Sequence, residues 1–212
     1  MKRILCFGDS NTWGYVPASV VERFPPEIRW TGVMREKLGN GFEIIEEAQN
    51  GRTTVFDDPY ETVCKNGSRH LPVVLESQKP IDLVILMLGT NDLKAHLNQT
   101  AKTIALGAGV LVDRILVSDA GPGRKAPHVL LVAPALVADA NCPFGPKFDG
   151  AAAKSLGFCE AYRREAELRG VPFINAADHV TVPATDCVHF DKVGHGALGA
   201  ALADRVRQLL SA

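Results

Sequence analysis

The chain has 212 residues, 46% of them hydrophobic, and its 23 lysine and arginine residues nearly balance 24 aspartate and glutamate residues. This length suits one sizeable core and is short for two ordinary domains, so we expect a single domain over residues 1–212. Because nucleic-acid-binding domains normally carry a basic excess, the balanced charge indicates a small, not strongly charged substrate and no nucleic-acid partner.

Short apolar runs alternate with longer stretches of helical periodicity along the chain. The apolar runs predict five strands, at Arg3–Phe7, Phe42–Glu46, Asp82–Leu88, His128–Ala133 and Val171–Asn175. The periodic stretches predict five helices, at roughly Trp30–Leu38, Leu71–Gln78, Thr100–Ser118, Phe148–Arg169 and Lys192–Leu210. The third and fourth runs are apolar on both faces, which is typical of parallel strands covered by helices on both sides. The alternation predicts an α/β fold, a three-layer α/β/α sandwich with a five-stranded parallel, flavodoxin-like sheet.

The start of the chain resembles a signal peptide only superficially. Lys2 and Arg3 precede an apolar run, but that run ends after four residues at Gly8, well short of the apolar region of a signal peptide. No run approaches the roughly 18 apolar residues of a membrane span. We therefore expect a soluble, cytoplasmic protein with no membrane partner.

The five cysteines are odd in number and irregular in spacing, and no CxxC motif occurs. This pattern argues against a disulfide framework or a zinc knuckle. Cys187 is interpreted as a small buried side chain. The histidine and aspartate residues are scattered, so we expect neither a metal nor another cofactor.

Three proline-containing segments interrupt the alternation, at about 15–29, 52–70 and 136–147. They follow the first, second and fourth predicted strands. Ligands of open α/β sheets bind outside the carboxyl ends of the strands. We interpret the segments as loop insertions that form walls of a site or interfaces, with plain surface decoration as the alternative.

Four short blocks bear polar groups near the ends of the predicted elements. Ser10 follows the first strand, Gly51 follows the second in an Asn-Gly turn, and Asn91 follows the third. Asp186 stands three residues before His189, ahead of the last helix. Each block alone fits a cap, a turn or a surface contact. Together they supply a nucleophile, oxyanion donors, a base and a group that orients the base, which indicates acyl transfer.

These blocks resemble those of the SGNH (GDSL-type) hydrolases: GDS at 8–10, Gly51 in QNGRTT, GTND at 89–92 and DCVH at 186–189. The resemblance implies that Ser10 attacks an ester carbonyl, that His189 is the base and that Asp186 orients it. It also implies an oxyanion hole made by the N–H groups of Ser10 and Gly51 and the amide of Asn91.

Further residues near these blocks are candidates for binding substrate. Trp13 could line the alcohol or acyl pocket, or be a core tryptophan. Arg52 and Thr53 could line the entrance, or simply pack their loop. Asn11, beside the nucleophile, is a further candidate, whereas Asp9 is expected to anchor the turn that aims Ser10.

The longer strings GDSNTWGY and QNGRTT resemble the arylesterase or acyltransferase branch of this family. The branch implies hydrolysis of short-chain (acetyl-like) and aryl esters through an acyl-enzyme, with alcohol or peroxide as alternative acyl acceptors. It also implies a homo-oligomer, an octamer or a smaller even assembly.

Two other functions remain open at this point. A carbohydrate O-deacetylase would share the triad and differ in its pocket. A non-catalytic flavodoxin-like ligand-binding module would share the sheet, although the loop after the first strand lacks a phosphate cradle. That module would also leave Asp186 and His189 without a role.

Overall fold

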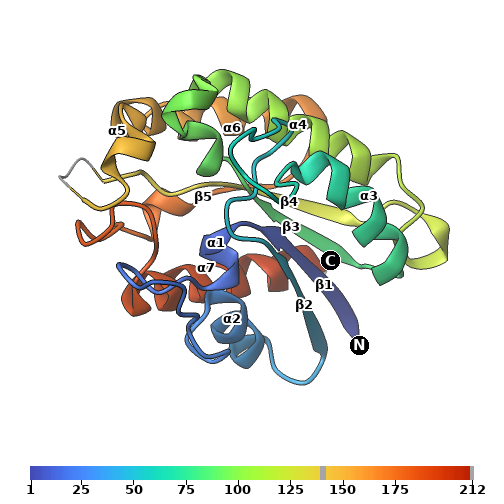
Figure 1. The fold of residues 1–212 in the computed structure, drawn as a ribbon. Helices are drawn as coiled ribbons and strands as arrows, with labels where there is room; N and C mark the ends of the chain where they lie inside the picture. Colours follow the sequence, from blue (N-terminus) through green and yellow to red (C-terminus); the bar gives the residue numbers. More distant parts are fainter. Residues whose placement is uncertain (139–141, 211–212) are drawn as a thin grey trace.

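The computed structural model describes residues 1–138 and 142–210 and is built around one parallel sheet (Figure 1). The strand order is β2-β1-β3-β4-β5. The strands are β1 (Lys2–Gly8), β2 (Phe42–Ala48), β3 (Leu83–Met87), β4 (His128–Ala133) and β5 (Phe173–Asn175). This order is that of flavodoxin-like doubly wound sheets, in which the strand order reverses between β1 and β3 while all strands stay parallel. The predicted fold class is confirmed.

Helices cover both faces of the sheet (Figure 1). One face is covered by α3 (Gly67–Gln78), α4 (Ala101–Leu116) and α6 (Phe158–Arg169). The other face is covered by α2 (Trp30–Leu38) and α7 (Lys192–Leu210). Two short helices, α1 (Ser10–Trp13) and α5 (Ala151–Ser155), complete the α-helices of the described ranges.

The buried parts of β1, β3 and β4 are apolar because both faces of these strands are covered. In β1, Leu5 and Phe7 belong to the core under α3, α4 and α6, whereas Ile4 and Cys6 belong to the core under α2 and α7. Every residue of β3 is buried. Successive side chains of a strand point to opposite faces, so an uninterrupted apolar run fills both cores at once.

Some element boundaries differ from the prediction. The stretch predicted as one helix at Phe148–Arg169 contains two α-helices, which are separated at Leu156 and Gly157, the latter capping α6. Helix α3 begins four residues earlier than predicted because the Asn66 side chain accepts a hydrogen bond from the N–H of Ser68 at 3.0 Å. Residues 67–70 therefore belong to a helix and not to the second predicted insertion.

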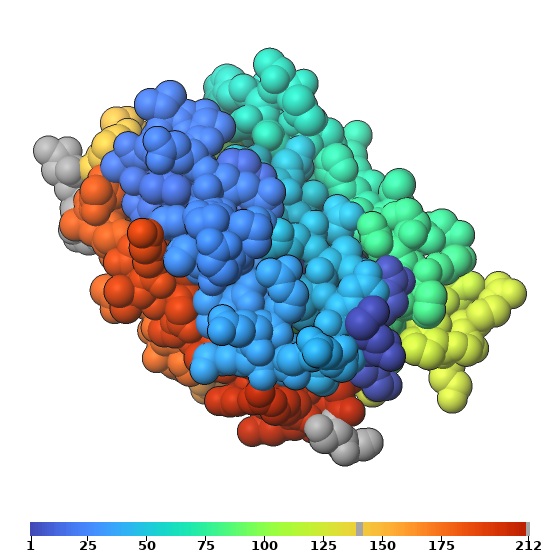
Figure 2. Space-filling model, turned by 90° about the horizontal axis from the view of Figure 1, so that it is seen from below, coloured from blue at the N-terminus to red at the C-terminus, as the bar shows by residue number. Residues whose placement is uncertain are grey.

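The segment at 15–29 lies beside the part of the chain that precedes α7 (Figure 2). There the N–H of Ala18 donates to Asp186 Oδ2 at 3.2 Å. Within the two described ranges, no helix combines the length and apolar character needed to cross a bilayer.

Candidate active site

The nucleophile candidate Ser10 sits where β1 turns directly into α1. Asp9 caps this helix, and its Oδ1 accepts a hydrogen bond from the N–H of Asn11 at 2.9 Å. A Cβ atom at Gly8 would lie 2.0 Å from Thr12 Oγ1, so only glycine lets the helix fold back onto the end of its strand. The turn presents Ser10 at the carboxyl edge of the sheet.

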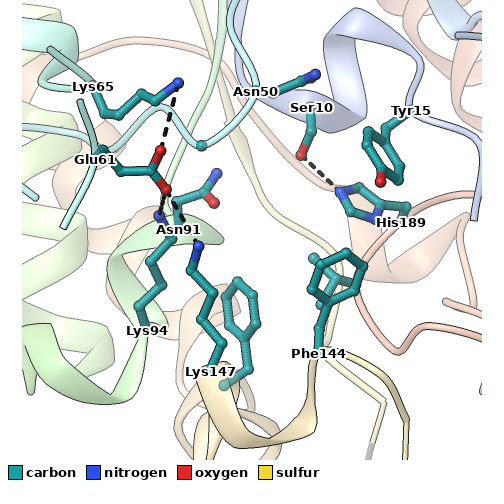
Figure 3. Close-up of a pocket in the computed structure, with 13 residues that line it drawn as sticks. Ser10, Tyr15, Asn50, Glu61, Lys65, Asn91, Lys94, Phe144, Lys147 and His189 are labelled. Carbon is teal, nitrogen blue, oxygen red and sulfur yellow. Dashed lines mark hydrogen bonds and ion pairs between the residues drawn. The ribbon is translucent and has the colours of Figure 1, made fainter. Parts of the chain in front are cut away.

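Three side chains form a hydrogen-bonded series at this edge. His189 Nε2 lies 3.0 Å from Ser10 Oγ, and His189 Nδ1 lies 2.7 Å from Asp186 Oδ2 (Figure 3 shows the first contact). All three residues are buried. A hydroxyl, an imidazole and a carboxylate in this order can perform nucleophilic acyl transfer.

Asp186 also holds the loop that carries the histidine. Its Oδ1 accepts hydrogen bonds from the N–H of Val188 at 3.0 Å and the N–H of His189 at 2.9 Å. Burial raises the pKa of Asp186, but hydrogen bonding and the charge of His189 outweigh burial and bring this pKa below its ordinary value. The carboxylate therefore stays ionised at neutral pH and stabilises a protonated imidazole.

Asn11 makes a second link between the nucleophile helix and the histidine loop. Its Nδ2 donates to the carbonyl oxygen of Val188 at 3.2 Å, and its Oδ1 accepts from the N–H of Phe190 at 3.1 Å. These bonds flank His189 on both sides. Asn11 thus fixes the position of the His189 loop relative to Ser10.

The residues of the three expected oxyanion donors, Ser10, Gly51 and Asn91, lie together at this edge. Gly51 has φ +82°, which turns its peptide in a way that favours glycine. Asn91 Nδ2 donates to the carbonyl oxygen of Arg52 at 3.1 Å, which fixes the amide at the end of β3. Among the described residues, the N–H groups of Ser10 and Gly51 have no protein acceptor, so they are free to bind a developing oxyanion.

These groups open into a hollow of about 190 Å³. One side of it is an aromatic wall, which consists of Tyr15 and Phe144. The Tyr15 ring stacks on the imidazole of His189 with centroids 4.3 Å apart, and Phe144 meets the same imidazole edge-on at 5.5 Å. This wall shields the base from solvent.

The opposite side of the hollow is a charged wall, which consists of Glu61, Lys65, Lys94 and Lys147 (Figure 3). Lys94 Nζ lies 3.1 Å from Glu61 Oε1, and Lys147 Nζ lies 3.2 Å from the same oxygen. Lys65 Nζ lies 3.8 Å from Glu61 Oε2. One carboxylate is thus shared by three ammonium groups.

The structure gives the four predicted substrate-binding residues other contacts. Within the described ranges, none of them lines the hollow: Trp13, Asn11, Arg52 and Thr53. The guanidinium of Arg52 lies over the Phe7 ring at 4.3 Å and donates to the carbonyl oxygen of Gly8 at 2.9 Å. Thr53 Oγ1 donates to the carbonyl oxygen of Phe56 at 2.6 Å. Arg52 and Thr53 therefore brace the turn that carries Gly51.

Both walls contain residues that the sequence did not single out. The aromatic wall comes from the segments at 15–29 and 136–147, and Glu61 and Lys65 come from the segment at 52–70. The only signal for them was the length of these segments after strand ends. Lys94 follows GTND by two residues and could have been suspected from that position.

One expectation about the cysteines was wrong. Cys187 is buried, as predicted, but it forms a disulfide with Cys142, and the two Cα atoms lie 6.1 Å apart. The N–H of Ala138 also donates to the carbonyl oxygen of Cys187 at 2.9 Å. The segment that carries Phe144 therefore packs against the histidine loop, a contact that spacing along the chain could not reveal. No cluster suited to a metal ion occurs among the described residues.

Asp92 anchors the second loop to the site and is expected to make stability depend on pH. It is fully buried and accepts hydrogen bonds from the N–H of Thr54 at 3.0 and 3.1 Å. Burial is the main cause that raises its pKa to about 7. An unfolded aspartate has a pKa of about 3.9, so between these values the native state holds a proton that the unfolded state releases.

The native state should therefore lose stability as pH rises from about 4 through 7. Asp92→Asn cannot ionise, so the Tm of this variant minus the Tm of wild type should increase between pH 5 and pH 8. Thermal unfolding followed by circular dichroism checks this, with the exposed Asp149→Asn as the matched control. A difference that stays constant with pH would contradict the expectation.

Comparison with known proteins agrees with this geometry. A family model described as GDSL-like lipase/acylhydrolase matches residues 6–197. An aryl esterase from M. smegmatis is 44% identical with a TM-score of 0.94, and the match covers 99% of this chain and 100% of that one.

Two solved structures from Sinorhizobium meliloti are also similar. A carbohydrate acetylesterase is 42% identical with a TM-score of 0.94, covering 99% of this chain and 100% of that one. A carbohydrate acetylesterase family member is 34% identical with a TM-score of 0.94, covering both chains fully. No match was found among curated proteins.

Proposed function

The chain belongs to the GDSL-like lipase/acylhydrolase family and is a carboxylic ester hydrolase, and from this premise we propose that it hydrolyses short-chain and aryl esters with Ser10 as nucleophile. The observation that carries the proposal is the series of contacts from Ser10 Oγ through His189 to Asp186. In the described ranges no other serine has this arrangement.

The proposed reaction follows from these contacts. His189 Nε2 takes the proton of Ser10 Oγ as the oxygen attacks the ester carbonyl carbon. The N–H groups of Ser10 and Gly51, with the amide of Asn91, stabilise the oxyanion. The bond to the alcohol then breaks, and His189 gives the alcohol its proton. Water then attacks the acyl-enzyme while His189 takes its proton; the bond from the acyl carbon to Ser10 Oγ breaks, the acid leaves, and His189 returns the proton to Ser10 Oγ.

A short acyl group and an aromatic alcohol suit the walls of the hollow. Its volume of about 190 Å³ leaves little room for a long chain, and Tyr15 and Phe144 offer rings beside the position where the alcohol leaves. We expect kcat/KM to fall from 4-nitrophenyl acetate through butyrate to octanoate, with no added metal. Octanoate turned over as fast as acetate would contradict the short acyl pocket.

The same wall supports acyl transfer as a second outcome of the acyl-enzyme. The rings cover the imidazole, which limits access of water and favours an alcohol or peroxide as acceptor. In mixtures of water and alcohol, the ratio of new ester to free acid among the products should exceed the molar ratio of alcohol to water. Product ratios that simply follow the concentrations would reject transfer.

Carbohydrate O-deacetylation is a second candidate, since carbohydrate acetylesterases are among the similar structures. Measuring kcat/KM for acetylated sugars and for aryl acetates tests this candidate: a higher value for the sugars would favour deacetylation of carbohydrates. The alternative interpretation from the sequence, a non-catalytic ligand-binding module, is wrong because the chain is an ester hydrolase.

We also propose a homo-oligomer, an octamer or a smaller even assembly. Exposed apolar side chains in two inserted segments support it, namely Val20 and Val21 in the first and Tyr60 and Val63 in the second. Such side chains favour burial against another copy. Light scattering should give a mass several times that of one chain, and a monomer would contradict the proposal.

The predicted cytoplasmic location stays a proposal. The apolar run after Lys2 and Arg3 forms strand β1, which lies between β2 and β3 in the sheet. The bond between Cys142 and Cys187 stands against this location, because cytosolic proteins rarely keep disulfides. Cell fractionation tests the proposal: the protein should be recovered in the cytoplasmic fraction.

A further inference from the structure

The charged wall contains more positive than negative charge. Within the described part of the chain, Lys65, Lys94 and Lys147 pair with two carboxylates, those of Glu61 and Asp58. The contacts of Glu61 lie next to Asn91 and across the same hollow from Ser10 (Figure 3). A charged group beside a nucleophile is a means of selecting substrates by their charge.

Lys94 is fully engaged and does not contribute to this excess. Its side chain is 2% exposed, and its Nζ lies 2.7 Å from Asp58 Oδ2. Burial raises the pKa of Asp58, but the hydrogen bond from Lys94 and further hydrogen bonds outweigh burial and lower this pKa to about 2. His96 Nε2 meets the other oxygen of Asp58 at 2.9 Å. The charges of Lys94 and Asp58 therefore balance each other in a buried pair at the base of the wall.

Two ammonium groups remain against one carboxylate at the surface of the hollow. Among the described residues, Lys65 and Lys147 have only Glu61 as an ion-pair partner. The Lys147 side chain is 45% exposed, so its ammonium can reach a ligand without leaving a buried site. The wall can therefore accept one more anionic group.

The geometry of the reaction decides which end of the substrate meets this wall. The leaving alcohol must lie within reach of His189 Nε2, which places it beside the aromatic wall of Tyr15 and Phe144. The carbonyl oxygen lies toward Gly51 and Asn91. The acyl substituent must then extend away from His189, toward the charged wall, which Figure 3 shows on the opposite side of the hollow.

We propose that the preferred acyl group carries a carboxylate, so that the substrate is a hemiester of a short dicarboxylic acid whose free carboxylate pairs with Lys147 and Lys65. This inference rests on the proposed function of Ser10 and His189. Ser10 Oγ forms the bond to the acyl carbon, the alcohol leaves with the proton from His189, and water then releases the dicarboxylate.

Two esters that differ only in charge test the proposal. Monobenzyl succinate carries the free carboxylate, and benzyl levulinate has a methyl ketone of similar shape in its place. We expect wild type to prefer the succinate in kcat/KM by about tenfold, the size of a hydrogen bond between charged groups. Lys147→Met should bring this ratio close to one, and Lys147→Arg should keep it high.

Lys125 is exposed and lies away from the hollow, so Lys125→Met removes one positive charge elsewhere on the surface. This control variant should keep the wild-type kcat/KM for both esters and therefore their ratio. A wild-type ratio at or below one, with benzyl levulinate still hydrolysed, overturns the acyl preference and leaves the esterase intact. A high ratio that Lys147→Met does not lower overturns the role of Lys147. If wild type hydrolyses none of the three esters, including 4-nitrophenyl acetate, the proposed function itself is overturned.

Discussion

Ser10→Ala is expected to lower kcat for 4-nitrophenyl acetate by about a millionfold, with a small change in KM. Ser10 Oγ is the hydroxyl within 3.0 Å of His189 Nε2, so its loss removes both the attacking atom and the acyl-enzyme. The oxyanion donors remain, and they account for a residual rate above that of water. Assays stopped at fixed times, with a large excess of enzyme over substrate, measure this residual rate.

The control for this variant is Ser77→Ala, which removes an exposed hydroxyl from α3. We expect it to keep the wild-type rate. The variant Ser10→Ala should also keep the wild-type circular dichroism spectrum, because one oxygen atom is removed without a change in packing. Equal rates for Ser10→Ala and wild type would show that another group is the nucleophile.

Asp186→Asn is expected to lower kcat by about ten-thousandfold while the fold stays intact. The wild-type Oδ2 accepts a hydrogen bond from His189 Nδ1 at 2.7 Å, which leaves Nε2 without a proton and able to take that of Ser10. An amide nitrogen in place of Oδ2 donates to Nδ1 and moves the imidazole proton to Nε2. The base then faces Ser10 with the wrong tautomer.

The remaining oxygen of this asparagine can still accept from the N–H groups of Val188 and His189, so the loop should keep its shape. The amide nitrogen meets the N–H of Ala18, which donates to Oδ2 in wild type, and we expect a small loss of Tm from that contact. The exposed Asp204→Asn is the matched control. A rate within tenfold of wild type would show that Asp186 does not set the tautomer.

The sheet and the meeting of Ser10 and Asn91 at one of its edges were predictable because both follow simple patterns. Strands β3 and β4 are apolar on both faces, and only a covered parallel sheet buries such runs. Ser10 and Asn91 follow strands of this sheet directly. Since parallel strands end at one edge, their order along the chain was enough to bring these residues together.

The walls of the hollow were not predictable in this way. Phe144 and Lys147 lie in a segment without regular periodicity, and its path depends on a disulfide between residues 45 positions apart. Overall charge balance indicated a substrate without strong charge, but it cannot show that Lys65 and Lys147 gather at one place. Arg52 seemed suited to substrate from its position beside Gly51, yet its guanidinium turns inward onto Phe7.

The contact between Ser10 and His189 joins residues that are 179 positions apart. During synthesis Ser10 leaves the ribosome well before His189, which follows 179 residues later. Helix α7, which packs on α2 and closes one core, comes later still. We therefore expect a growing chain that has not reached His189 to lack esterase activity, so the appearance of activity in a translation reaction would report that the loop of His189 has docked beside β1.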